Sequence, residues 1–200
     1  MKPIIVANWK MQLGVNETVN RLTALRLYVK DFGYQIDVAV CPSTISLTKA
    51  KEILVTSKIQ LGAQDVFWEE KGAYTGETSP RQLQEIGVRY VIVGHSERRE
   101  FLGETDSMVG QKVMSTLAHG LLPILCVGET AHHRNDNVHE MVITQQLDRA
   151  LQSATPPNKN QMLLVAYEPM WAIGTGEPAS PAVADQMRQE IGRASCRERV

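Results

Sequence analysis

The chain has 200 residues, a formal net charge of -1, 43% hydrophobic residues and 22% charged residues. This composition is typical of one soluble globular domain with a sizeable core and argues against disorder. Because the chain has no basic stripe and no apolar run as long as a membrane span, we expect a cytoplasmic protein that binds neither nucleic acid nor membrane. Cys41, Cys126 and Cys196 form no CxxC pair, so neither a disulfide framework nor a zinc site is indicated, and the first two are expected to be buried thiols.

Short apolar runs alternate with longer amphipathic, charged segments along the chain. The runs predict strands at residues 4–9, 36–41, 59–63, 90–94, 122–127 and 162–167. Nearly continuous apolar sequence is typical of parallel strands that are buried on both faces. Helices are predicted at residues 16–30, 48–56, 80–86, 105–119 and 137–152, and a last one begins at Ser180 and Pro181, a capping residue followed by proline. The pattern indicates one α/β domain of six βα units without an internal linker.

Glu168 closes the sixth predicted strand and leads into a segment that is built to move. Pro169 lacks the N–H that would continue a strand ladder, so the carboxylate lies at the strand's end. Gly174 and Gly176 give the next segment backbone freedom, and Trp171 gives it an apolar underside that excludes water. The pattern predicts a catalytic base beneath a lid. For this glutamate alone, a solvated strand end is the alternative interpretation.

Polar residues also end the first and fourth predicted strands. Asn8 and Lys10 end the first, while His95 and Glu97 follow the fourth, where residues 96–100 are predicted to form a short helix. The positive end of a helix dipole disfavours an imidazolium, so a neutral His95 can donate to a developing oxyanion, and Lys10 can attract an anionic substrate. Taken singly, a structural histidine and a surface lysine are the alternatives. Only a fold that gathers the ends of strands one, four and six makes them one site.

Five motifs resemble those of triosephosphate isomerases, in that family's order and approximate spacing. They are NWKM at residues 8–11, GAYTGET at 72–78, GHSERR at 94–99, CVGET at 126–130 and AYEPMWAIGTG at 166–176. The resemblance implies an isomerase of glycolysis and gluconeogenesis that interconverts dihydroxyacetone phosphate and glyceraldehyde 3-phosphate through an enediolate, with no cofactor and no metal. It also implies a TIM (β/α)8 barrel that is incomplete, with about six of its eight βα units present.

The resemblance implies a role for each residue at the strand ends. Glu168 would move a proton between neighbouring substrate carbons, and His95 and Asn8 would polarise the substrate oxygens. Lys10 would balance negative charge, and Glu97 looks like the supporting residue beside the histidine and the lysine. These five residues are the expected catalytic set.

Further contacts follow from the same resemblance. The backbone N–H of Gly174 would meet the substrate phosphate, together with Asn8 and Lys10. Thr75, at the tip of residues 72–78, resembles the tip of a loop that inserts into a partner subunit. We therefore expect a homodimer, with Thr75, Glu77 and Arg98 as dimer contacts.

Three departures from the family pattern are visible. Met170 stands where valine is common, and Asp65 stands where asparagine is common. Glu177 and Pro178 replace a more flexible end of the lid, so the rate of lid closure is expected to differ while the chemistry is kept.

Residues 191–200 depart from the resemblance, which runs from residue 3 to about residue 190. They carry three arginines, and Gly192 falls within the helix that begins after Ser180. We expect these residues to interrupt that helix. A nucleotide sequence that resembles a common sequencing-adapter read translates codon by codon into these residues. We therefore expect a partial barrel at residues 1–190 and a non-native tail at 191–200, with a natural variable end as the alternative. Because such a barrel needs about 250 residues, the 200-residue chain alone is expected to be inactive.

Two other functions remain open on the sequence. One is a binding or assembly module without catalysis, and the other is a different phosphosugar isomerase on the same barrel. Lys10, His95, Glu97 and Glu168 together argue against the first, because a binding module needs no base. The lid motif at residues 166–176 argues against the second.

Overall fold

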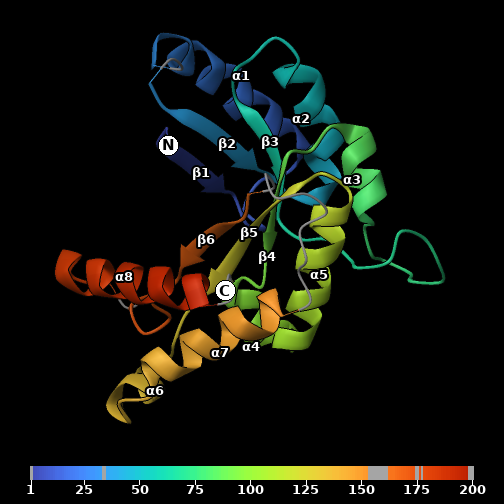
Figure 1. The fold of residues 1–200 in the computed structure, drawn as a ribbon. Coiled ribbons are helices and arrows are strands. Elements are labelled where there is room, and N and C mark those ends of the chain that lie inside the picture. The colour runs from blue at the N-terminus through green and yellow to red at the C-terminus, as the bar shows by residue number, and fades with distance from the viewer. Residues whose placement is uncertain (1, 33–34, 153–161, 174–175, 177, 198–200) are drawn as a thin grey trace.

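The computed structural model describes residues 2–32, 35–152, 162–173, 176 and 178–197. In these residues six strands form one parallel sheet in the order of the chain, and helices connect each strand to the next (Figure 1). The strands are β1 (Ile4–Asn8), β2 (Asp37–Cys41), β3 (Gln60–Ala63), β4 (Tyr90–Val93), β5 (Leu122–Val127) and β6 (Leu164–Tyr167). All six strands were predicted from the apolar runs. Most are shorter than predicted, and β1 ends before Trp9 because Lys10 turns away with φ 49°.

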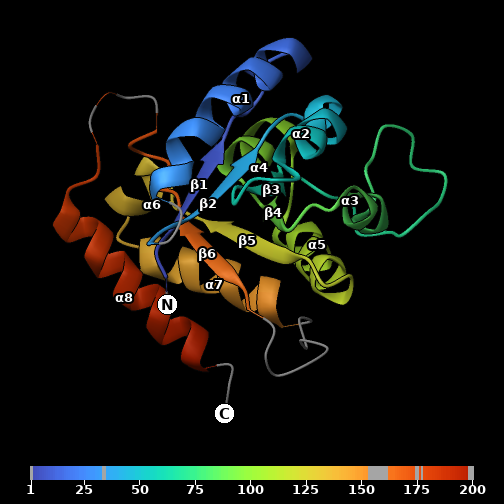
Figure 2. The same ribbon diagram turned by 90° about the horizontal axis from the view of Figure 1, so that it is seen from above.

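The helices lie outside the strands. Seen from above, the helices surround the strands of the sheet (Figure 2). They are α1 (Val15–Phe32), η1 (Thr44–Ser46), α2 (Leu47–Leu54), α3 (Pro80–Ile86), α4 (Ser96–Leu102), α5 (Asp106–Ala118), α6 (Ala131–Asn135), α7 (His139–Leu151) and α8 (Pro181–Arg197). Within the described residues, no helix is long and apolar enough to cross a membrane.

Local capping sets several helix boundaries. Ser79 and Gln82 form a capping box at the start of α3, with Pro80 in the first turn, and Gly87 ends the helix in the left-handed region. The predicted helix at residues 80–86 is therefore confirmed. The predicted helix at residues 137–152 begins later, at His139, and is preceded by the unpredicted α6, which Thr130 caps.

The two faces of the sheet form two separate cores. Alternate residues of a strand point to opposite faces, so Val40 faces the helices while Ala39 and Cys41 face the inside of the curve. Ile92 and Cys126 join the inner cluster from β4 and β5. The sheet is thus the wall of a curled half-barrel that has helices outside and apolar side chains inside. The expectation that Cys41 and Cys126 are buried is confirmed.

The first and last strands are the least covered parts of the sheet. In the described residues β1 pairs only with β2, and β6 pairs only with β5. Ile5 on β1 is 55% exposed, and every residue of β6 is only partly buried. The half-barrel therefore presents two open edges, and backbone groups of an open edge are free to pair with other segments.

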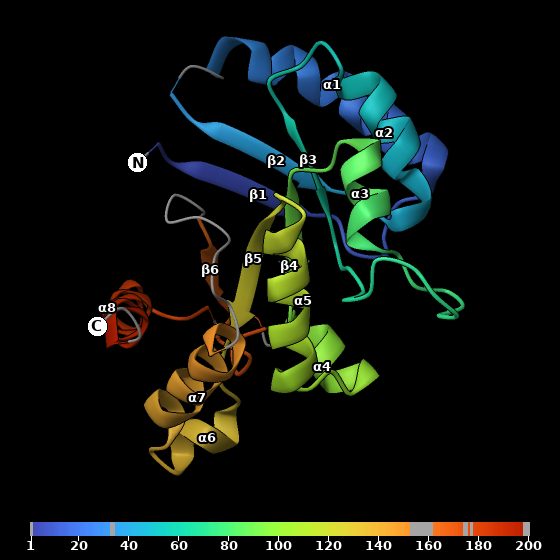
Figure 3. The ribbon, with the colours of Figure 1, turned by 45° about the vertical axis from the view of Figure 1, so that its right-hand side comes forward.

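Helix α8 lies beside β6 and α7 (Figure 3). The prediction that Gly192 interrupts this helix is wrong, because α8 continues to Arg197. A single glycine within a helix costs only about 1 kcal/mol. Met187 and Ala194, on either side of it, are buried in the outer core and offset that cost.

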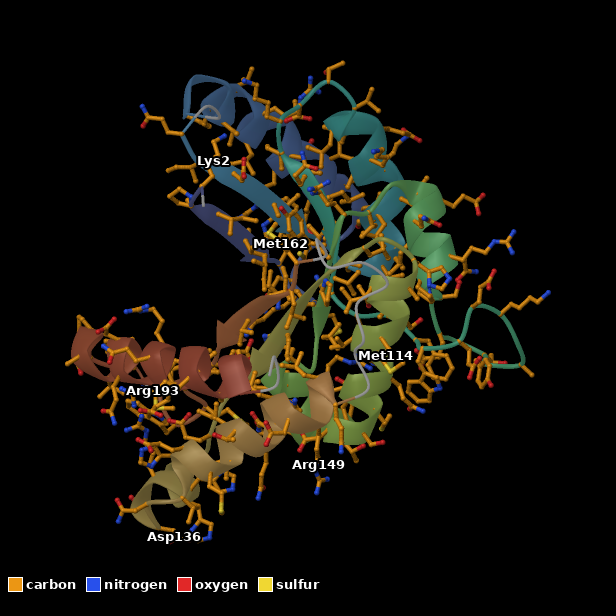
Figure 4. All side chains as sticks on the ribbon, in the orientation of Figure 1. Lys2, Met114, Asp136, Arg149, Met162 and Arg193 are labelled. Atoms are coloured by element: carbon orange, nitrogen blue, oxygen red, sulfur yellow. The ribbon has the colours of Figure 1, made fainter. Side chains whose placement is uncertain are left out.

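A long loop between β3 and α3 projects beyond α3 from the body of the molecule (Figures 1 and 2). The ring of Phe67 stacks on Trp68 and contacts Tyr74, and the Phe67 N–H donates to the Thr78 carbonyl at 2.8 Å. These contacts hold the base of the loop, while Thr75 near its tip is exposed. Elsewhere the surface combines exposed polar side chains, such as Asp136, Arg149 and Arg193, with exposed apolar ones, such as Met114 and Met162 (Figure 4).

Candidate active site

Four of the predicted site residues form one chain of contacts at the carboxyl ends of β1, β4 and β6. Lys10 Nζ lies 2.7 Å from Glu97 Oε1, and Glu97 Oε2 lies 3.5 Å from His95 Nδ1. His95 Nε2 lies 3.2 Å from Glu168 Oε1. Parallel strands place their carboxyl ends at one edge of the sheet, so residues distant in sequence meet there.

The hydrogen bonds of His95 define its tautomer. His95 is the N-cap of α4, and its Nδ1 accepts from the Glu97 backbone N–H at 3.2 Å. An accepting Nδ1 carries no proton, so the proton of a neutral ring is on Nε2. Nε2 is the atom that faces the carboxylate of Glu168. The site therefore presents a neutral N–H donor beside a carboxylate.

Glu168 is held at two points. Its Oε2 accepts from the Ser96 backbone N–H at 2.8 Å, while its Oε1 faces His95. The side chain of Glu168 is 17% exposed, so one side of the carboxylate remains open to the site. Burial, followed by the nearby carboxylate of Glu168, raises the pKa of the Cys126 thiol well above its usual value, so this neighbour is uncharged.

Gly128 lets the loop after β5 approach the end of β6. A Cβ atom at position 128 would lie 1.8 Å from the Glu168 carbonyl oxygen. No side chain fits there without moving the backbone of the candidate base. The side chain of Gln146 on α7 also fixes this glycine, since it accepts from the Gly128 N–H at 2.9 Å and donates to the Gly128 carbonyl at 3.0 Å.

Asn8, the last residue of β1, supports Lys10 in the loop that follows. Its Oδ1 accepts from the Lys10 backbone N–H at 2.9 Å. The side chains of Lys10 and Glu97 are 39% and 42% exposed, so the ammonium group is accessible to an anion that enters the site. This contact occupies the Asn8 carboxamide oxygen.

The start of the lid is fastened to a buried carboxylate that received no role from the sequence. Glu129 follows β5 and is fully buried, and its Oε1 accepts from Trp171 Nε1 at 2.8 Å, from the Tyr167 hydroxyl at 2.8 Å and from Arg134 Nε at 2.6 Å. The Arg134 guanidinium also lies over the Trp171 ring, 4.8 Å from its centroid. Burial raises the pKa of Tyr167, so its hydroxyl remains a donor. The signal for Glu129 was available, because it is another polar residue just after a buried strand.

Arg99 joins the ends of β4 and β5. Its Nε donates to the Gly94 carbonyl at 2.7 Å and its Nη2 donates to the Cys126 carbonyl at 3.4 Å, while Nη1 pairs with Asp106 at 2.5 Å. Gly94 immediately precedes His95. The Arg99 guanidinium therefore fixes the end of β4, which carries His95, the candidate hydrogen-bond donor.

Of the remaining predicted site residues, those that the structure describes lie apart from this cluster. Gly174 lies outside the described residues, and Thr75 and Glu77 are exposed in the projecting loop. Arg98 points away from the chain of contacts and pairs with Asp65 at 2.8 Å and with Glu104 at 3.3 Å.

Lys112 completes the network of Arg98, Asp65 and Glu104. It is 2% exposed and pairs with Asp65 at 2.7 Å and also with Glu104. Burial raises the pKa of Asp65, and Lys112 and Arg98 oppose that shift. This network joins the segment after β3 to α4 and α5, so the aspartate that departs from the family pattern has two cationic partners.

Comparisons with known proteins identify the family of the chain. The family model described as triosephosphate isomerase matches residues 3–199. A triosephosphate isomerase of Thermoanaerobacter sp. (strain X514) is 46% identical over 190 residues, which are 95% of this chain and 75% of that protein. Those of Caldanaerobacter subterraneus subsp. tengcongensis and Clostridium botulinum (strain Loch Maree / Type A3) are 45% and 44% identical, over 95% and 92% of this chain and 75% and 73% of theirs. The chain belongs to the triosephosphate isomerase family.

Proposed function

We propose that Glu168 is the base in the interconversion of dihydroxyacetone phosphate and glyceraldehyde 3-phosphate, the isomerisation that defines this enzyme family. In the forward direction the carboxylate takes a proton from C1 of dihydroxyacetone phosphate, and the C–H electrons form an enediolate. The proton then returns to C2, the hydroxyl proton on O1 passes to O2, and the C1–O bond becomes the aldehyde carbonyl. No atom is gained or lost, so the reaction needs only a base and groups that stabilise the negative oxygen.

The supporting observation is the pair formed by His95 Nε2 and Glu168 Oε1, which are 3.2 Å apart. A base beside a neutral N–H donor is the arrangement that proton abstraction next to a carbonyl requires. When substrate enters, the Nε2–H donates to the substrate oxygen in place of the carboxylate, which turns to the C–H bond. Lys10 balances the enediolate charge, Glu97 fixes Lys10 and His95, and Asn8 contacts the substrate.

The same proposal extends to substrate binding and assembly. The Gly174 N–H holds the phosphate when the lid closes, and Trp171 leaves Glu129 to allow that movement. We also propose a cytoplasmic homodimer in which Thr75, Glu77 and Arg98 contact the partner. The projecting loop between β3 and α3 (Figure 1) and the exposed side chain of Met11, next to Lys10, support such an interface.

The open edges of β1 and β6 affect residues 1–200 when they are expressed as a separate polypeptide. We propose that this polypeptide is inactive, because in the part of the chain that the structure describes β1 and β6 have a neighbouring strand on one side only, and because lid closure relies on a phosphate grip that uses further loops. We also propose that residues 191–200 are a non-native tail. Sequencing the genomic locus beyond codon 189 tests this, and a locus that encodes this decapeptide followed by a stop codon contradicts it.

The activity is tested with the protein expressed from its intact genomic locus. Isomerisation of glyceraldehyde 3-phosphate is followed in both directions, with other phosphosugars as alternative substrates. The proposal predicts rapid turnover of triose phosphates alone. Rapid turnover of a different phosphosugar, or binding without turnover, contradicts it.

A further inference from the structure

Lys10 has an unusual backbone. Among the described residues, only Lys10 and Asn137 combine a side chain with a positive φ, and Lys10 has φ 49°. Residues with a Cβ atom rarely adopt this left-handed conformation, and it persists only where the surroundings impose it. The conformation follows directly after β1, so it determines the direction in which the lysine side chain leaves the sheet edge.

Gln64 contacts the backbone of Lys10 from the end of another strand. It follows β3, and its Nε2 donates to the Lys10 carbonyl at 2.9 Å and to the Cys41 carbonyl at 2.8 Å. A carboxamide nitrogen has two hydrogens, so both donors of Gln64 are used. The Cys41 carbonyl also accepts from the Trp9 N–H at 3.1 Å. Gln64 therefore joins the carbonyl of the strained residue to a fixed point at the end of β2.

Lys10 is thus fixed at three atoms. Asn8 Oδ1 accepts its N–H, Gln64 donates to its carbonyl, and Glu97 pairs with its ammonium group. Asn8 and Glu97 belong to the proposed catalytic set, while Gln64 makes no described contact with His95 or Glu168. Its contacts hold the lysine backbone instead of the reacting groups.

We propose that Gln64 is a positioning residue, which holds Lys10 in its left-handed conformation and thereby directs the ammonium group into the site. This inference rests on the proposed role of Lys10 in binding the anionic substrate. Without the two hydrogen bonds, the backbone of Lys10 relaxes towards negative φ and the ammonium group leaves its place beside Glu97. The effect then falls on substrate binding as well as on turnover.

The test is Gln64→Met in the protein from the intact locus, because methionine keeps the length of the side chain and removes both donors. Loss of two hydrogen bonds predicts a fall of kcat/KM by roughly 10-fold or more, with a raised KM for glyceraldehyde 3-phosphate. A crystal structure of the variant is expected to show Lys10 at negative φ. Gln82→Met is the matched control. Gln82 belongs to the capping box of α3 and does not contact Lys10, so this substitution lowers stability without disturbing the lysine.

A double-mutant cycle separates positioning from a general structural effect. In a Lys10→Met background, Gln64→Met is expected to change kcat/KM by less than about twofold, because the group that it positions is absent. An equal loss in both backgrounds, or an unchanged KM with Lys10 still at positive φ, overturns the proposal. The unsubstituted protein is assayed alongside, so a lack of isomerase activity there counts against the proposed function and not against Gln64.

Discussion

His95 and Glu168 lie on the ends of β4 and β6, 73 positions apart in the sequence, yet His95 Nε2 is 3.2 Å from Glu168 Oε1. The Ser96 N–H, next to the histidine, donates to the other carboxylate oxygen at 2.8 Å. The start of α4 thus holds both oxygens of the candidate base. This relationship makes specific predictions about the two side chains and about their neighbours.

Glu168→Gln is expected to leave folding intact and to remove most activity. An amide has nearly the same shape but does not accept the substrate's proton. A general base contributes roughly 10²- to 10⁴-fold to the rate, so kcat should fall by at least about 100-fold. The control is Glu85→Gln, which changes an exposed glutamate on α3. A Glu168→Gln protein that melts normally and retains more than about a tenth of its activity is incompatible with the role of base.

His95 is expected to carry its proton on Nε2 at neutral pH, since Nδ1 accepts from the Glu97 N–H. Nitrogen-15 NMR of the ring distinguishes the tautomers, because protonated and unprotonated ring nitrogens have different shifts. His95→Gln supplies the assignment by the loss of its signals. A ring with its proton on Nδ1 means that the donor role is wrong, and a ring with protons on both nitrogens means that the donor is not the neutral imidazole.

Glu129→Ala is expected to destabilise the protein, because Arg134, Tyr167 and Trp171 lose their shared acceptor. Removing one partner of a buried charged network typically lowers the free energy of unfolding by about 2–4 kcal/mol. Glu129→Gln keeps one acceptor oxygen and should lower it less. Urea unfolding measures both changes. Equal stability of the two variants and the unsubstituted protein shows that the network contributes nothing.

Cys41 makes a contribution to stability that depends on pH. Burial raises its pKa from 9.0 to about 12 in the folded protein. A raised folded pKa means that the contribution is present below pH 9 and is lost as pH rises towards 12. From pH 8 to pH 10 the loss is about 1.4 kcal/mol, because only the unfolded thiol ionises in that range.

Cys41→Ala isolates this contribution from the other groups that titrate there. The stability difference between the unsubstituted protein and the variant, measured by urea unfolding, should shift by that amount in favour of the variant between pH 8 and pH 10. Parallel pH profiles for the two proteins show that the Cys41 thiol does not remain protonated in the folded state.

The polypeptide of residues 1–200, expressed by itself, is expected to lack detectable isomerase activity and to aggregate. Ile5 is exposed on β1, and neither outer strand has a neighbour on its free side within the described residues. Net stabilities are only about 5–15 kcal/mol, which is a small margin against such loss of packing. Size-exclusion chromatography and a cooperative thermal transition measure the outcome. A monodisperse, active polypeptide of this length refutes the expectation.

The strands were predictable because each buried strand is a nearly continuous apolar run, and α3 was predictable because Ser79, Pro80 and Gly87 mark its ends. Helix α6 was missed, since its short polar sequence has no apolar periodicity and no buried residue. The interruption at Gly192 was wrong because the packing of Ala194 and Met187 outweighs a weak local preference.

The residues at the ends of β1, β4 and β6 were predictable from their places on the strands and from the family motifs. Their supports were not, because such contacts depend on the folded arrangement. Gln64 lies 54 positions from Lys10, and nothing in its local pattern indicates that its amide reaches the Lys10 carbonyl. The tautomer of His95 likewise depends on a backbone N–H that the fold of α4 brings to Nδ1.

Isomerisation in D2O reports on proton transfer by Glu168. Dihydroxyacetone phosphate is converted by the protein from the intact locus, and NMR measures deuterium at C2 of the glyceraldehyde 3-phosphate formed. A fraction of the product is expected to carry deuterium at C2, because a proton on Glu168 exchanges with solvent, and Glu168→Gln is expected to form almost none of this product. Product that retains substrate hydrogen at C2 in every molecule, formed at an undiminished rate by Glu168→Gln, would contradict proton transfer by Glu168.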